Sequence, residues 1–409
     1  MRKRMIQILI FVFVDVLGFS LILPLLPYYA DEFGANATLI GLLAASNAVT
    51  QLIGAPIIGR LSDRYGRRPL LIVSILGTIA SFLLLGFANS IWMLFLSRSL
   101  DGLLGGNVSL ARAYVTDITG EEDRASSMGK IGATFGLGFI FGPALGGILS
   151  YGGNYARPAF AAAGLALLNL IGVLLWLPES LPVEERGKGA VEDRRRGFRL
   201  SRLREALGRP CVGPLLVVQL VSSLAFTMFQ SIFSTYALYR FDLQSQNTSY
   251  ILTYVGMLIV VIQGWGIGKL TGRFNERAIA FVGVSLLPLG LLGWAFAPSV
   301  WFLLIVLAPI SLSTGILNTV ISSLLSKVAR REETGGVLGI AASMGSLARV
   351  IAPITGGTLI DQLGTWAPGV LGAVIMLLLV PYAYGRLLSI PEPPKPGCQP
   401  IGEARPARA

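Results

Sequence analysis

The chain has 409 residues, of which 53% are apolar and only 13% charged, and its mean hydropathy is +0.69. Soluble domains carry about 25% charged residues, so this composition excludes both a soluble globular enzyme and a disordered protein. The net charge of +11 would suggest a nucleic-acid partner in a soluble protein, but here the basic residues gather between long apolar runs. We therefore expect an integral membrane protein in a lipid bilayer, with no nucleic-acid partner.

The apolar runs predict an all-α fold with twelve transmembrane helices. A hydrocarbon core of roughly 30 Å takes about 20 helical residues, and these runs are continuous, whereas strands of a membrane barrel alternate. The run 278–326 breaks at Ala297-Pro298-Ser299, which predicts a helical hairpin. The other predicted spans are, in chain order, about 6–29, 33–59, 69–97, 92–117, 131–156, 158–178, 210–239, 243–268, 334–358 and 362–385.

The basic residues predict the orientation of the spans. Most of the 33 lysines and arginines fall in segments on one side of the predicted membrane. Cytoplasmic loops carry this excess, so both chain termini are expected in the cytoplasm and the protein in the plasma (inner) membrane. These segments are the N-terminus, 59–69, 118–130, 180–210, 268–278, 326–334 and the C-terminal tail.

The chain divides into two similar halves. Pro143 with Gly146-Gly147 in the fifth span recurs as Pro353 with Gly356-Gly357 in the eleventh. We expect an N-terminal half (1–179), a basic cytoplasmic linker (180–210), a C-terminal half (211–388) and a disordered cytoplasmic tail (389–409). Duplicated six-helix halves are typical of secondary transporters, which bind substrate between the halves near the membrane midplane.

A charged loop follows the second span. It reads Gly-Arg-Leu-Ser-Asp-Arg-Tyr-Gly-Arg-Arg-Pro over residues 59–69. Gly66 can adopt a positive φ, and Asp63 is the one acid among four arginines, where charge-assisted bonds are expected.

This loop resembles the hallmark Gly-x-x-x-Asp-x-x-Gly-Arg-Arg motif of the major facilitator superfamily, and the resemblance extends over essentially the whole chain. In that family the loop acts as a cytoplasmic latch. The resemblance implies that Asp63 faces the N-terminus of the eleventh helix, near 334, in the outward-open state, and that Arg67 pairs with Asp117. In the second half the position matching Asp63 is Gly272. The implied latch residues are Gly59, Asp63, Gly66, Arg67, Arg68 and Asp117.

The fifth span is similar to that of the drug–proton antiporter branch, and the chain as a whole is most similar to tetracycline exporters. Gly138, Gly142 and Gly146 lie four apart, so they form a smooth ridge for helix packing, and Pro143 and Gly147 complete the motif. The third-helix acid of tetracycline exporters falls on Ser81 here. We therefore expect a substrate other than a tetracycline–metal complex.

Few charges lie within the predicted spans, and such charges persist in membranes only when paired or facing water. Arg98 and Asp101 are three residues apart and can pair on one helix face. Asp15 has no charged partner nearby in the sequence. We expect Asp15 or Asp101 to exchange the coupling proton, and Arg98 to lower the proton affinity of whichever acid it neighbours. Arg349, in the eleventh span, either pairs with one of these acids or recognises an anionic substrate group.

Polar and aromatic residues on the predicted cavity-lining helices are candidate substrate contacts. Gln219, Phe226 and Gln230 face one side of the seventh span. Asn47 and Gln51 on the second span are weaker candidates. For each polar candidate, an interhelical hydrogen bond would explain the residue at least as well. The substrate-binding set is Asn107, Gln219, Phe226, Gln230, Asn318 and Arg349.

Together these patterns predict a secondary active transporter that works by alternating access as a functional monomer. We expect a proton-coupled antiporter that exports a small amphipathic molecule or drug. The alternative is a metabolite or sugar carrier of the same fold, working by uniport or symport. No enzymatic activity, metal or cofactor is expected beyond the proton as coupling ion, because the chain has no histidine and no nucleophile or phosphate-loop motif.

Overall fold

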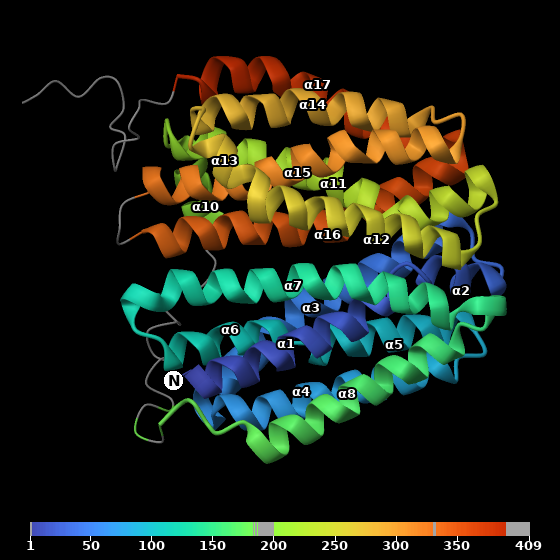
Figure 1. Ribbon diagram of the computed structural model, residues 1–409, viewed down its shortest axis with the longest axis vertical. Helices are drawn as coiled ribbons and strands as arrows, with labels where there is room; N and C mark the ends of the chain where they lie inside the picture. The colour runs from blue at the N-terminus through green and yellow to red at the C-terminus, as the bar shows by residue number, and fades with distance from the viewer. Residues whose placement is uncertain (1, 183, 185, 187–199, 330–332, 390–409) are drawn as a thin grey trace, which may run out of the picture. The chain divides into compact units, whose positions relative to one another are not determined.

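The computed structural model describes residues 2–182, 184, 186, 200–329 and 333–389. The described part of the chain is helical (Figure 1), which confirms the predicted all-α fold. Eleven helices in this part are long and apolar enough to cross a membrane. Residues 183, 185 and 187–199 of the predicted linker, and the tail from 390, lie outside the described residues.

The first half of the chain contains eight α-helices in the described range, with a short 3-10 turn (Tyr151–Gly153) before the last of them. The elements are α1 (Arg2–Ile22), α2 (Leu26–Glu32), α3 (Ala37–Tyr65), α4 (Arg67–Gly86), α5 (Ile91–Leu104), α6 (Asn107–Ile118), α7 (Glu121–Leu149) and α8 (Ala156–Trp176). Helices α1 and α2 together form the first membrane span. The fourth predicted span is divided, because the helix breaks at Gly105-Gly106 between α5 and α6.

The second half repeats this helical pattern. Its elements are α10 (Leu200–Gly208), α11 (Val212–Phe241), α12 (Ser245–Val261), a π-helical turn (Ile262–Gly266), α13 (Ile267–Thr271), α14 (Glu276–Ala295), α15 (Val300–Val328), α16 (Thr334–Leu363) and α17 (Ala367–Leu387). The predicted break at 297–299 separates α14 from α15. Internal prolines such as Pro309 and Pro353 are accommodated inside these helices, as is common in membrane spans.

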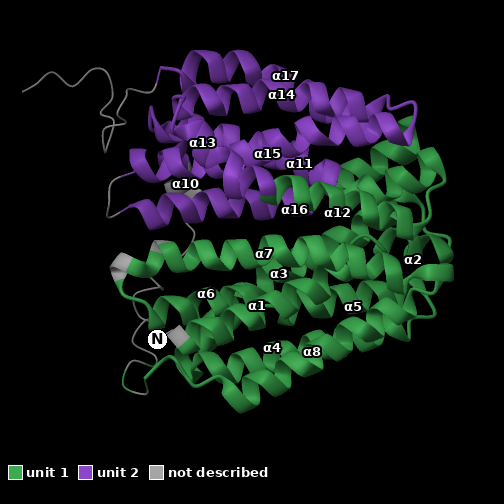
Figure 2. Cartoon of the chain, viewed as in Figure 1, with its two compact units in different colours: residues 1–197, 231–260, 353–365 green, residues 198–230, 261–352, 366–409 purple. Residues whose placement is uncertain are grey.

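The helices gather into two compact units (Figure 2). Unit 1 comprises residues 1–197, 231–260 and 353–365, and unit 2 comprises 198–230, 261–352 and 366–409. Unit 1 therefore holds α1–α8 together with parts of α11, α12 and α16. The predicted domain boundary at 180–210 stays a prediction.

Each unit has its own apolar core. In unit 1, α1 packs against α7 and α8, α3 against α5, and α4 against α5 and α8. Ile8, Leu71 and Leu94 are fully buried there. In unit 2, α14 packs against α15 and α17, and the rings of Phe229 and Trp294 meet edge to face at 5.0 Å. These cores hold the polar side chains of the candidate site between rigid helices.

Candidate functional site

A buried polar cluster occupies the interior of unit 1. Asn107, the first residue of α6, donates from Nδ2 to Asp15 Oδ1 on α1 at 2.6 Å and to Thr78 Oγ1 on α4 at 3.3 Å. Asn107 is only 3% exposed. We expected Asn107 to contact substrate, whereas in this structure its amide holds the carboxyl group of Asp15.

The second acid of the cluster lies on α5. Asp101 accepts a hydrogen bond from Asn47 Nδ2 on α3 at 3.0 Å, and its Oδ2 lies 3.7 Å from Arg98 NH1. Asn47 also donates to the carbonyl oxygen of Arg98 at 3.1 Å. Asp15 and Asp101 lie close enough for their charges to interact. The structure thus brings the three predicted proton-coupling residues into one region.

Serine hydroxyls complete the environment of Arg98. Ser81 and Ser97 exchange hydrogen bonds between each hydroxyl and the other residue's carbonyl oxygen, both at 2.8 Å. Arg98 NH2 lies 3.4 Å from Ser81 Oγ, and its guanidinium stands 5.6 Å from the ring centre of Phe82. At position 81, Arg98 therefore meets a hydroxyl group.

The break between α5 and α6 separates Asp101 from Asn107. Gly105 N donates to Asp101 O at 2.6 Å, and the Ser74 hydroxyl on α4 donates to Leu104 O. A Cβ at Gly106 would lie 2.9 Å from a methyl group of Ile58, so the backbone passes close to α3. Asp101 thus lies in the last turn of α5, while Asn107, which holds Asp15, begins α6.

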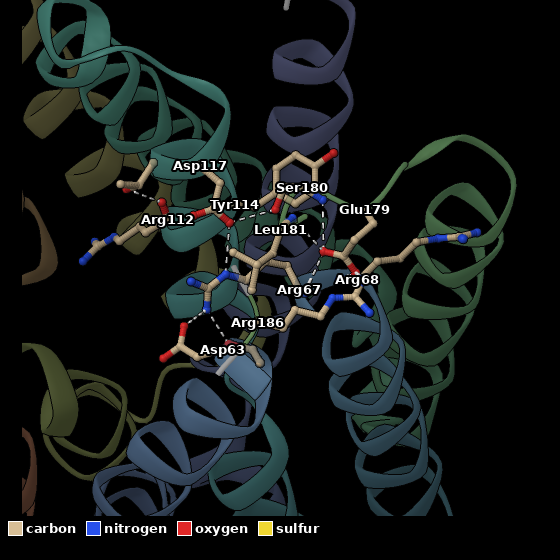
Figure 3. A network of polar contacts seen from close by, with 12 residues as sticks. Asp63, Arg67, Arg68, Arg112, Tyr114, Asp117, Glu179, Ser180, Leu181 and Arg186 are labelled. Carbon is tan, nitrogen blue, oxygen red and sulfur yellow. Dashed lines mark hydrogen bonds and ion pairs between the residues drawn. The ribbon is translucent and has the colours of Figure 1, made fainter. Parts of the chain in front are cut away.

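A second polar network lies at one end of unit 1, which we call the Arg67 end (Asp63, Arg67, Asp117 and Glu179). The guanidinium of Arg67 lies between two acids, with Asp63 Oδ1 at 2.5 Å from NH1 and Asp117 Oδ2 at 3.1 Å from Nε (Figure 3). Ser180 donates to the same Asp117 oxygen at 2.9 Å. The structure therefore brings together the two residues of the implied Arg67–Asp117 pair.

Glu179, which the sequence did not single out, anchors the loop. Its carboxylate accepts from the backbone N–H groups of Arg67 at 2.8 Å and Arg68 at 3.1 Å, at the positive start of α4. Gly66 has φ 104°, and a Cβ there would overlap Glu179 Oε2. The guanidinium of Arg68 donates to Leu174 O at 2.6 Å. The only sequence signal for Glu179 was an isolated acid directly after a span.

The expected loop over 59–69 is wrong in extent, because α3 continues to Tyr65 and α4 begins at Arg67, so that only Gly66 lies between the two helices. Gly59 lies inside α3. A Cβ at Gly59 would meet no atom within 4 Å. Nothing in the structure explains why this position is a glycine.

The glycine ridge of α7 forms the contact with α1. Cβ atoms at Gly142 and Gly146 would overlap Ser20 Oγ and Leu21 O, and one at Gly138 would lie 2.7 Å from Val16 Cγ1. Pro143 is buried beside the ridge. On another face of α7, a Cβ at Gly147 would lie 2.9 Å from Ser249 Cβ on α12. These residues lie at helix interfaces, and the antiporter role implied for them stays a prediction.

The other predicted substrate contacts lie on helices of unit 2. Gln219 donates to Ser223 Oγ at 3.1 Å, and the rings of Phe226 and Phe229 are 6.0 Å apart. Arg349 is exposed in unit 2, and its NH2 lies 3.0 Å from Ser346 Oγ. The further residues Gln230 on α11 and Asn318 on α15 are also exposed in this unit.

Unit 2 carries a counterpart of the Arg67 network with reversed charges. Glu276, at the start of α14, lies 2.8 Å from Lys327 near the end of α15. Arg277 donates to Leu388 O at 3.1 Å, as Arg68 does to Leu174 O. The repeat of the two halves therefore extends to the placement of these polar contacts.

The helical bundle holds a buried charge cluster, and a charged helix-end contact recurs in its two halves. These two features define a membrane transporter of duplicated design. The chain belongs to the Major Facilitator Superfamily, whose sequence profile matches residues 8–297 and 215–408.

Individual relatives cover nearly the full chain. The tetracycline resistance protein, class C, of Escherichia coli is 30% identical over 93% of this chain and 96% of its own length. Solute carrier family 22 member 18 of Rattus norvegicus is 30% identical over 89% of both chains. The crystal structure of the human organic anion transporter MFSD10 (TETRAN) superimposes with a TM-score of 0.68 at 25% identity, over 93% of this chain and 99% of that one. These similarities confirm the predicted resemblance to superfamily exporters.

Proposed function

We propose that this transporter works by alternating access as a proton-coupled antiporter that exports a small amphipathic molecule. It lies in the plasma (inner) membrane with both chain termini in the cytoplasm, which the positive-inside rule supports. The Arg67 end then faces the cytoplasm and serves as the latch. The transporter acts as a monomer without metal or cofactor.

One observation carries the proton coupling. The cluster of Asp15, Asp101 and Arg98 holds two carboxyl groups and one guanidinium, and the guanidinium lies beside Asp101. Asp15 is held by the neutral amide of Asn107. A carboxylate without a cationic partner costs at least about 2.5 kcal/mol at the centre of a membrane span. A proton from the medium removes that cost, so Asp15 is the acid that binds and releases it.

Substrate recognition is assigned to unit 2. Gln219, Gln230 and Asn318 offer amides, Phe226 offers an aromatic face, and Arg349 offers a guanidinium. An organic anion with an apolar body suits this set, because a guanidinium binds anionic groups while amides and rings tolerate varied neutral surfaces. The relative named as an organic anion transporter supports this choice.

The test uses purified protein in liposomes with an imposed pH gradient and an internal pH dye. Tetracycline, cationic and neutral drugs, organic anions and sugars are added one at a time. We expect an organic anion or drug to trigger proton movement. Asp15→Asn should abolish the proton movement while the protein still binds the same compound, because the amide cannot carry a proton.

The matched control is Asp123→Asn, which neutralises an exposed acid on α7 outside the cluster and should leave proton movement unchanged. Intact substrate-driven proton movement in Asp15→Asn would contradict the role of Asp15. Substrate flux without proton movement in the unsubstituted protein would replace antiport by the uniporter alternative.

A further inference from the structure

Parts of α12 and α16, from the second half of the chain, pack against the first half within unit 1 (Figure 2). The part of this packing that joins α3 to α16 is called here the Asp361 contact (Ala37, Thr38, Pro353, Gly357 and Asp361). Here α3 and α16 approach so closely that a Cβ at Gly357 would overlap Ala37 O, and one at Gly41 would overlap Pro353 O. The two halves therefore meet backbone to backbone at this point.

Asp361 binds the start of α3. Its Oδ1 accepts from Ala37 N at 3.1 Å, and its Oδ2 accepts from Thr38 N at 2.8 Å and from Thr38 Oγ1 at 2.6 Å. The side chain of the N-cap residue Asn36 accepts a hydrogen bond from Leu39 N at 2.9 Å. A helix leaves its first amides without partners inside the helix. Two of these amides in α3 are thus satisfied by a carboxylate from the other half of the chain.

The position of Asp361 in its own helix makes this arrangement informative. It lies two residues before the end of α16 at Leu363, where the helix dipole is negative and disfavours an acid. The positive start of α3 favours the same acid. Asp361 is therefore better placed for the neighbouring helix than for its own.

Buried hydroxyl groups extend the contact between the halves. Tyr28 OH on α2 and Thr248 Oγ1 on α12 lie 2.5 Å apart, and Ser150 Oγ and Ser245 Oγ lie 3.2 Å apart. Ser249, one turn further along α12, is completely buried against the α7 glycine Gly147. Separation of α12 from α7 would expose Ser249 to water.

We propose that Asp361 is a positioning residue for transport, a carboxylate latch that caps α3 from the other half of the chain and holds this end closed. The proposal rests on the alternating-access cycle proposed above, in which the halves must separate at this end once per cycle. When they separate, the first two amides of α3 lose their protein acceptor and gain water. The charge and the length of the Asp361 side chain therefore set how often the two halves separate at the Asp361 contact.

The experiment measures opening directly through Ser249→Cys, a substitution of nearly equal size at a buried position. A hydrophilic maleimide is added to detergent-solubilised protein, and the rate of alkylation is followed by mass. The protein without Ser249→Cys gives the background rate of alkylation. When closing is faster than alkylation, the rate is proportional to the open population.

Asp361→Asn, in the Ser249→Cys protein, should raise this rate roughly fivefold, the ratio that corresponds to about 1 kcal/mol for a helix-capping acceptor. Thr38→Val should raise it about twofold, because it removes one of the three donors and keeps the two amides. Asp361→Glu keeps the charge and should stay closer to the unsubstituted rate than Asp361→Asn. Gln362→Ala, at the exposed neighbouring position, should leave the rate unchanged.

An unchanged rate in Asp361→Asn overturns the latch, and so does an equal rise in Gln362→Ala, which would indicate general loosening of α16. If Asp361→Asn does not elute as a folded protein, Thr38→Val against Gln362→Ala decides the same question. The measurement needs neither substrate nor proton gradient. Failure of the latch is therefore distinguishable from failure of proton-coupled export, which the liposome experiment tests.

Discussion

At the scale of single residues, the reversed charges of the two halves have a local explanation. In unit 1, Arg67 is shared by Asp117 and Asp63, and Asp63 lies one helical turn before it. In unit 2 the position matching Asp63 is Gly272, which carries no charge. Without a neighbouring acid, Glu276 can take the place of the arginine there, with Lys327 as its partner.

This explanation predicts that the two pairs respond differently when their charges are exchanged. The combination Arg67→Glu with Asp117→Lys places a second acid beside Asp63 and should destabilise the protein by about 1–3 kcal/mol, because these side chains are largely shielded from solvent. The combination Glu276→Lys with Lys327→Glu meets no such third charge and should cost less than about 1 kcal/mol, mainly from a cation at a helix start. The midpoint of thermal unfolding in detergent measures both.

Adding Asp63→Asn to the first combination serves as its control. It removes the repulsion and should recover most of the lost stability. If the exchange in unit 1 were tolerated as well as that in unit 2, Asp63 would not be the reason for the difference.

The residue scale also marks the limit of what the sequence could predict. Arg67 and Asp117 could be paired because the family motif implied it. The partner of Asp15 could not, since Asn107 reaches it only through the break between α5 and α6. Glu179 lies 112 residues from Arg67, and nothing local to either residue indicates that its carboxylate caps α4.

At the scale of helices, spans and their packing faces were largely predictable. Hydropathy gives the length of a helix, and glycines four residues apart indicate a packing ridge, which is the face of α7 that meets α1. The break in the fourth span was not predicted. The pair Gly105-Gly106 is a signal for such a break, and contacts with Ser74 on α4 and Ile58 on α3 accompany it in the structure.

Two glycines of α7 offer a matched test of this packing. Gly142→Ala places a methyl group against Ser20 and the backbone of Leu21, where neighbouring atoms leave no space. It should lower stability by about 1–3 kcal/mol, as overpacking does. Gly132→Ala adds the same group on the same helix where no atom lies within 4 Å, so it should be neutral or gain up to about 1 kcal/mol from helix propensity.

Thermal unfolding in detergent and the yield of folded protein measure both α7 variants. Equal effects at positions 142 and 132 would mean that the ridge tolerates a methyl group and that close packing is not its role.

At the scale of the whole molecule, the second and eleventh spans carry reciprocal acids. Asp63 lies two residues before the end of α3, and Asp361 two residues before the end of α16. In this structure Asp361 caps α3, while Asp63 is bound by Arg67 at the start of α4. The family resemblance implies that Asp63 faces the start of the eleventh helix in the outward-open state. Each acid would then stabilise one of the two states of the cycle.

This arrangement predicts opposite effects of neutralising the two acids. Asp361→Asn removes an acceptor from the state described here and should increase alkylation of the Ser249→Cys protein. Asp63→Asn removes an acceptor from the other state and should decrease it by roughly the same factor, about fivefold. The double substitution should return the rate close to that of the unsubstituted protein, because distant and independent sites add. Arg60→Gln, at an exposed position of α3 three residues before Asp63, controls for the loss of one nearby charge and should leave the rate unchanged. If Asp63→Asn raised the rate as Asp361→Asn does, the two acids would both hold the same end closed, and the reciprocal arrangement would be wrong.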